Sequence, residues 1–77
     1  MTDVPFPGLS TENPDSEGVV STWFVGEGES VAAGQLLAEV QVDKVAAEVH
    51  SPVAGVVRRL VEEEAVVTQG EAIARIE

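Results

Sequence analysis

The sequence predicts an all-β fold, a sandwich of two mostly antiparallel sheets with about four strands in each. Two observations predict it. Apolar and polar residues alternate along short segments bounded by Gly, Pro and Asp, which is the period of half-buried strands. The second half of the chain also repeats the first. Two short units that cannot each bury an apolar face are expected to pack together about a quasi-twofold axis.

The 77 residues predict a single domain, 1–77, with an entry strand and surface loop in 1–17 and a duplicated core in 18–77. A chain of this size buries only about 60% of its unfolded surface, so a large enclosed active site is not expected. The sequence contains no cysteine, which excludes disulfides and zinc–thiolate sites. Stability must then come from packing and turns.

The entry strand is expected near Asp3–Phe6, a short and partly apolar segment. A loop is expected from Pro7 to Glu17, because its Pro-Gly and Asn-Pro-Asp-Ser segments form turns and show no apolar period. The repeat follows this loop. Gly18–Phe24 aligns with Gly55–Val61, and 31–40 aligns with 67–76.

The strongest competing helix covers Val57–Val67, which is rich in Arg, Leu and Glu. Gly55 and Gly70 bracket this segment at turn positions. The matching segment of the first half is interrupted by Gly26-Glu27-Gly28, which a helix interior does not tolerate well. We therefore predict strands throughout, and a hairpin turn at Gly26–Gly28.

A second hairpin has a two-residue turn, Asp43-Lys44. Its predicted inward positions are Leu36, Ala38, Val40 and Val42 before the turn and Val45, Ala47 and Val49 after it. The turn is an exposed tip, and Lys44 is the only lysine of the chain. A quasi-twofold exchanges the ends of the sandwich, so Glu77 is expected at the end opposite Lys44.

Other polar or aromatic features favour structural roles. Glu62–Glu64 is predicted to be a solvated loop, because consecutive carboxylates repel and point in different directions. His50 is expected on the surface, without a partner for acid–base catalysis. Trp23 is expected to pack in or beside the core, and Arg58 and Arg59 to lie on a strand surface.

The formal net charge of −10 and the pI near 4.2 indicate repulsion of phosphate backbones and anionic lipids. Neither nucleic acid nor a membrane is expected as a partner. No apolar run approaches the roughly 18 residues of a membrane span, and no targeting segment is recognisable. The expected location is the bacterial cytoplasm, or the mitochondrial matrix if the source is eukaryotic.

The chain resembles a lipoyl domain of the 2-oxo acid dehydrogenase complexes over nearly its whole length. The segments that carry the resemblance are Val42–Val45 with the following Glu48–Val57, Trp23–Val31, and Gly34–Val40. The resemblance implies a flattened barrel-sandwich of two four-stranded sheets. It also implies lipoate joined by an amide bond to Lys44.

The resemblance further implies a swinging arm that carries acyl groups and electrons between the active sites of other proteins. These are a thiamine-diphosphate 2-oxo acid decarboxylase, an acyltransferase core and a flavin-dependent dihydrolipoyl dehydrogenase; a lipoate ligase or lipoyl transferase attaches the cofactor. The domain itself is expected to be a non-catalytic monomer. A domain excised from a dihydrolipoamide acyltransferase is favoured over a free-standing carrier, and both interpretations stay open. Residues expected to be recognised by the ligase or partners are Gln41, Val42, Asp43, Val45 and Glu48.

Several positions depart from the resemblance. Gln41 stands where Glu is frequent, Val42 where Thr is frequent, and Val45 where Ala is common. The loop Gly8–Glu17 is longer and more polar than usual, and the resemblance implies that it lies near the turn and helps partner recognition. Two alternatives remain open: a biotin carboxyl carrier domain, whose lysine is usually flanked by Met, and an unmodified barrel-sandwich interaction module.

Overall fold

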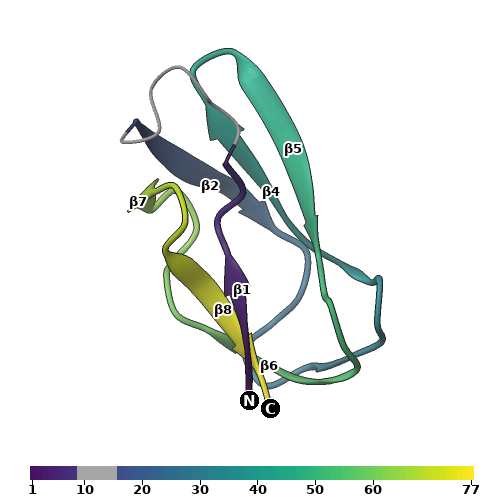
Figure 1. The fold of residues 1–77 in the computed structure, drawn as a ribbon. Helices are drawn as coiled ribbons and strands as arrows, with labels where there is room; N and C mark the ends of the chain where they lie inside the picture. Colours follow the sequence, from purple (N-terminus) through teal and green to yellow (C-terminus); the bar gives the residue numbers. More distant parts are fainter. Residues whose placement is uncertain (9–15) are drawn as a thin grey trace.

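A computed structural model describes residues 1–8 and 16–77 as two antiparallel sheets (Figure 1). One sheet has the order β1-β8-β6-β3 and the other β5-β4-β2-β7. The predicted all-β sandwich of two four-stranded sheets is confirmed. The strands are β1 (Thr2–Pro5), β2 (Glu17–Trp23), β3 (Ser30–Val31), β4 (Leu36–Val42), β5 (Val45–His50), β6 (Gly55–Arg59), β7 (Val66–Thr68) and β8 (Ala72–Ile76).

The entry strand begins and ends one residue earlier than predicted, at Thr2–Pro5. Most of the predicted surface loop, residues 9–15, lies outside the described residues, and so does its proposed role in recognition. The described part of the chain contains strands and turns, and no helix there is suited to crossing a membrane. The segment from Val57 to Val67 is β6, a loop and the start of β7, as the repeat predicted.

The internal repeat appears as matching sheet orders and matching registers. β4 and β2 stand in one sheet where β8 and β6 stand in the other. Val20 pairs with Val40 between β2 and β4, and Val57 pairs with Ile76 between β6 and β8. The sequence alignment of the two halves equates these two pairs, so the quasi-twofold relation holds at the level of single residues.

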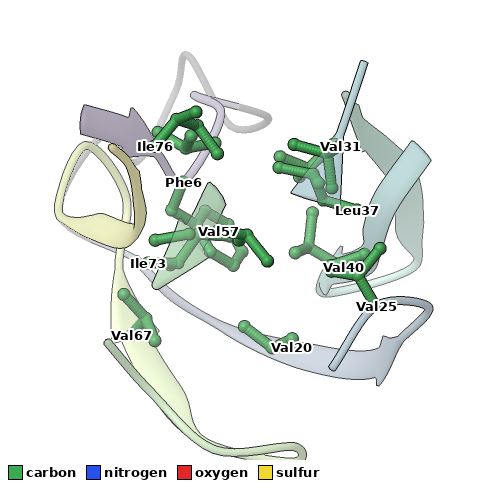
Figure 2. Packing of buried hydrophobic residues seen from close by; sticks show 14 of the residues in the cluster. Phe6, Val20, Val25, Val31, Leu37, Val40, Val57, Val67, Ile73 and Ile76 are labelled. Atoms are coloured by element: carbon green, nitrogen blue, oxygen red, sulfur yellow. The ribbon is translucent and has the colours of Figure 1, made fainter. Parts of the chain in front are cut away.

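The core lies between the two sheets and is built largely from repeat-related residues (Figure 2). Matching positions of the two halves both contribute, and Val is the commonest residue of this core. The largest fully buried side chains are Phe6, Leu37, Ile73, Ile76, Val20, Val40 and Val57.

The predicted inward face of β4 is wrong at its first position. Leu37 and Ala38 are both fully buried, whereas Leu36 is only half-buried. The pairing of β4 with β5 shifts between Leu36 and Ala38, and such a bulge lets two successive residues break the strict alternation. From Ala38 to Val42 the predicted alternation holds.

The turn at Gly26–Gly28 is present, but it does not form the predicted hairpin. β2 and β3 lie in different sheets, so this segment crosses from one sheet to the other. Glu29 N donates to Gly26 O across the turn, and Gly28 has a φ of 80°. The crossing brings Glu27 against β6 of the opposite sheet.

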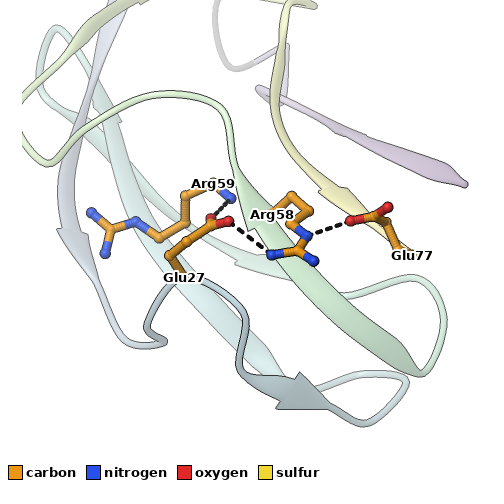
Figure 3. Close-up of polar contacts among 4 residues, drawn as sticks. All are labelled: Glu27, Arg58, Arg59 and Glu77. Carbon is orange, nitrogen blue, oxygen red and sulfur yellow. Dashed lines mark hydrogen bonds and ion pairs between the residues drawn. The ribbon is translucent and has the colours of Figure 1, made fainter.

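Two loop glutamates link the repeats in a reciprocal way. The backbone N–H of Arg59 donates to Glu27 Oε1 at 2.5 Å (Figure 3), and the backbone N–H of Trp23 donates to Glu63 Oε1 at 3.2 Å. Each loop therefore satisfies a strand-end donor of the other half. The loop Glu62–Glu64 is exposed, as predicted, yet Glu63 has this structural contact.

Arg58 and Arg59 do more than cover a strand surface. Arg58 forms ion pairs with Glu27, at 3.3 Å, and with Glu77 (Figure 3). The Arg59 guanidinium lies 5.0 Å from the centre of the Trp23 ring, a cation–π contact. Trp23 packs against the core, as expected.

Gly18 is packed so closely that a side chain there must displace its neighbours. A Cβ on Gly18 would lie 2.3 Å from Phe6 Cζ and 2.7 Å from Val42 Cγ2. We expect Gly18→Ala to lower the free energy of unfolding by about 1–3 kcal/mol, measured by urea denaturation. Gly26→Ala is the control, since a Cβ there meets nothing within 4 Å. Equal stability of the two variants would contradict this packing.

The contact between Glu27 and Arg59 predicts a pH-dependent contribution to stability. The donated backbone N–H of Arg59 is the main cause that holds the pKa of Glu27 below its ordinary value of 4.5, and Arg58 acts in the same direction. A carboxylate with a lowered pKa stabilises the fold above pH 4.5, and this contribution is lost as the pH falls through the lowered pKa.

We therefore expect Glu27→Gln to lower the thermal midpoint at pH 7 and to approach the wild-type midpoint as the pH falls below 4.5. Glu29→Gln removes the same charge two residues away and controls for the change in net charge. A Glu27→Gln difference that stays constant from pH 7 to acidic pH, after this correction, would contradict the assignment.

Candidate functional site at the β4–β5 turn

Lys44 lies at the tip of the β4–β5 hairpin, in the predicted two-residue turn. Val42 and Val45 form the last pair of the ladder, and Asp43 and Lys44 connect them. β4 is also paired with β2 on its other side, so a sheet rather than an isolated ribbon supports the tip. Lys44 is exposed, and within the described residues it makes no ion pair. The structure thus presents a solvated primary amine.

Figure 1 shows both chain ends at the end of the sandwich opposite the β4–β5 turn. The expected separation of Glu77 from Lys44 is therefore confirmed. β8 runs toward the terminal end, and its Ile76 pairs with Thr2 of β1. The exposed turn that holds Lys44 and the two chain ends therefore lie at opposite ends of the domain.

The turn has an unusual backbone at its first residue. Asp43 has a φ of 57°, whereas Lys44 does not have a positive φ. Type I′ hairpin turns need positive φ at both central residues, so the signs here match the type II′ pattern, which usually places Gly first. The left-handed region costs an ordinary residue roughly 1–2 kcal/mol, and Asp tolerates it better than most. The Gln41 side chain supports this turn, because its Nε2 donates to Asp43 O at 3.1 Å.

The two valines beside the turn differ sharply in exposure. Val42 is 3% exposed and packs at the root of the hairpin, beside Gly18 and Phe6. Val45 is 50% exposed although its phase along β5 is inward. The hairpin therefore has an apolar anchor before the turn and an exposed apolar side chain directly after Lys44.

The residues expected to take part in recognition are consequently of two kinds. Gln41, Asp43, Val45 and Glu48 are exposed around the tip, where another protein has access to them. Val42 is buried, so its side chain fixes the hairpin from within and offers no surface. His50, at the far end of β5, is exposed, as expected.

The outer face of the β4–β5 hairpin is acidic. Glu39 and Glu48 are directly paired across the two strands and are both exposed. Like charges at directly opposite positions destabilise a sheet. Beside Asp43 lies a shallow depression of about 220 Å³, lined in part by Glu17 and Gln41. This small open surface suits contact with another protein more than enclosure of a substrate.

Two determinants of the site were not recognised from the sequence alone. The first is Gly18, whose missing side chain makes room for Val42; its alignment with Gly55 was the available signal. The second is the hydrogen bond from Gln41 to Asp43 O. No period or motif marks such a bond, because it depends on the left-handed backbone of Asp43.

Comparison with known proteins defines the class. Residues 2–76 match the biotin/lipoyl family model, described as "Biotin-requiring enzyme". The chain therefore belongs to the biotin/lipoyl attachment family. Within it, the chain is similar to a lipoyl domain of the 2-oxoglutarate dehydrogenase complex from Azotobacter vinelandii, solved in solution. That similarity has a TM-score of 0.78 and 28% identity, covering 100% of this chain and 96% of that one.

Curated relatives of the chain include dihydrolipoyllysine-residue acetyltransferase components of pyruvate dehydrogenase complexes. The protein of Corynebacterium glutamicum is 41% identical over 76 residues, covering 97% of this chain and 11% of its own length. That of Staphylococcus aureus strain Mu50 is 42% identical over 62 residues, covering 79% of this chain and 14% of its own length. The chain is thus a lipoyl domain of the acyltransferase type, and it spans about an eighth of the length of these relatives.

The left-handed backbone of Asp43 predicts a difference between two substitutions that both remove its charge. Asp43→Asn is expected to leave stability nearly unchanged, because Asn tolerates positive φ. Asp43→Val is expected to lower the free energy of unfolding by about 1–2 kcal/mol, because a β-branched residue does not. Urea denaturation of the two variants measures the difference, and equal midpoints would contradict the strained turn.

Proposed function

We propose that the domain carries lipoate in amide linkage to the Nζ of Lys44 and serves as a swinging arm. The observation that carries the proposal is the position of the sole lysine at an exposed two-residue tip of a lipoyl-type sandwich. Bound lipoate supplies a dithiolane that carries acyl groups and reducing equivalents. The chain's own residues contribute attachment and presentation.

The surroundings of Lys44 support attachment by another enzyme. An exposed lysine amine is protonated at neutral pH and is a poor nucleophile until it is deprotonated. Within the described residues Lys44 forms no ion pair with a carboxylate that could act as a base, and the residues of the turn are exposed. A ligase or lipoyl transferase would therefore supply the activated carboxyl group and remove the proton. Gln41, Asp43, Val45 and Glu48 are exposed on the same hairpin and are available for recognition.

The proposed partners are a thiamine-diphosphate 2-oxo acid decarboxylase, an acyltransferase core and a dihydrolipoyl dehydrogenase. The domain catalyses none of their reactions. A tether raises the local concentration of the carried group near each active site. The separation of Lys44 from Glu77 supports this role, because a tether continuing from the C-terminal end would leave the arm pointing outward. Within a cell, we propose the bacterial cytoplasm or the mitochondrial matrix.

Intact mass after coexpression with a lipoate ligase and lipoate tests the proposal. We expect a lipoyl increment on the wild type and none on Lys44→Arg, which keeps the charge and removes the acylatable amine. Parallel expression with a biotin ligase and biotin tests the biotin carrier. A biotin increment in place of the lipoyl one transfers the function to that alternative, and modification by neither ligase favours an unmodified interaction module.

A further inference from the structure

The peptide group between Asp43 and Lys44 is the central peptide of the β4–β5 turn. The ladder ends at Val42 and Val45, so the Asp43 carbonyl lies beyond the last pair. Type I′ and type II′ turns have the same φ at the first central residue. They differ in the orientation of the central peptide, which is rotated by roughly 180° between them. This rotation also changes the sign of φ at the second residue, which here is Lys44. The orientation of the Asp43 carbonyl thus determines the direction in which the Lys44 side chain leaves the turn.

Gln41 makes a hydrogen bond to this carbonyl. Its Nε2 donates to Asp43 O at 3.1 Å, from a position on β4 that is itself paired with Val19 and Ala46. The donor therefore stands on a strand held on both sides, while the acceptor lies in the turn. Asp43 is also one of two described non-glycine residues with positive φ, so the turn needs support of this kind.

We propose that Gln41 is a positioning residue that holds the central peptide of the turn and so presents Lys44 for acylation; this role rests on the proposed function. The side-chain amide is essential because it donates. An ionised carboxylate only accepts hydrogen bonds, so a Glu at this position cannot make this contact when charged. The contact from Gln41 therefore requires a side chain that can donate.

The charges around Gln41 make a sharp test available. Glu39 and Asp43 lie on the same strand and turn, Glu48 lies on β5, and Glu17 borders the same depression from β2. The nearest cation along the chain is Lys44, which follows Asp43 in the turn. A glutamate introduced at position 41 would meet these carboxylates, which favour its protonated form, and the protonated form has an O–H that donates to Asp43 O.

The test measures backbone order in the unmodified domain with ¹⁵N heteronuclear NOEs at residues 43–46. Gln41→Met removes the donor and is expected to lower these values at every pH. Gln41→Glu is expected to match Gln41→Met at pH 8 and to return toward wild type as the pH falls. Gln35→Glu is the matched control, because Gln35 accepts a bond from Ala32 N through Oε1, which a carboxylate retains.

Lipoylation kinetics with a lipoate ligase provide the second readout. Gln41→Met is expected to lower kcat/KM by about two- to tenfold, the range that corresponds to one hydrogen bond, while the unfolding midpoint changes little. Wild-type NOE values in Gln41→Met, or no recovery of Gln41→Glu at low pH, overturn the role of Gln41. A wild-type domain that is never lipoylated overturns the proposed function instead, and the NOE values still decide whether Gln41 holds the turn.

Discussion

The close approach of strand backbone to side chains at two equivalent glycines is the constraint on which the fold depends. A Cβ on Gly18 would lie 2.7 Å from Val42 Cγ2, and a Cβ on Gly55 would lie 2.7 Å from Ile76 Cγ2. The repeat thus uses the same device twice, at the start of β2 and at the start of β6. In the first half, close packing on Gly18 fixes Val42 at the base of the β4–β5 hairpin. In the second half, close packing on Gly55 fixes Ile76 of β8, the last strand. Packing that fixes the domain therefore also fixes the site.

Charge is distributed unequally over the two sheets. Arg58 and Arg75 form their ion pairs in the sheet β1-β8-β6-β3, with Glu27, Glu77 and Asp3. The β4–β5 hairpin of the other sheet holds Glu39 opposite Glu48, a pairing that opposes stability. The buried side of that hairpin offsets this cost, because Val40 and Val42 are almost fully buried. The domain is therefore held together by its buried side chains, and the acidic residues on the outer face of the hairpin do not contribute to that stability.

Sequence reasoning succeeded where a residue's environment follows from a local period or from the repeat. The two sheets, the absence of helix at Val57–Val67, and the exposed turn at Lys44 all depend on alternation and on the match between the halves. It failed where tertiary contact overrides the period. The bulge after Leu36 breaks the alternation, and the turn at Gly26–Gly28 crosses between sheets instead of closing a hairpin. Such crossings depend on which sheet offers a free edge, which no local pattern records.

The chemistry of this site depends on shape more than on local reactivity. Within the described residues Lys44 is exposed and forms no ion pair, so what distinguishes it from other surface amines is its position at the tip of the hairpin. Three features define that geometry: the anchored Val42, the left-handed Asp43 and the bond from Gln41 to its carbonyl. Substitutions at these three positions are consequently expected to affect how the amine is presented rather than whether it is present. A modifying enzyme that binds an already ordered turn gains affinity, because no binding free energy is lost in ordering a flexible loop.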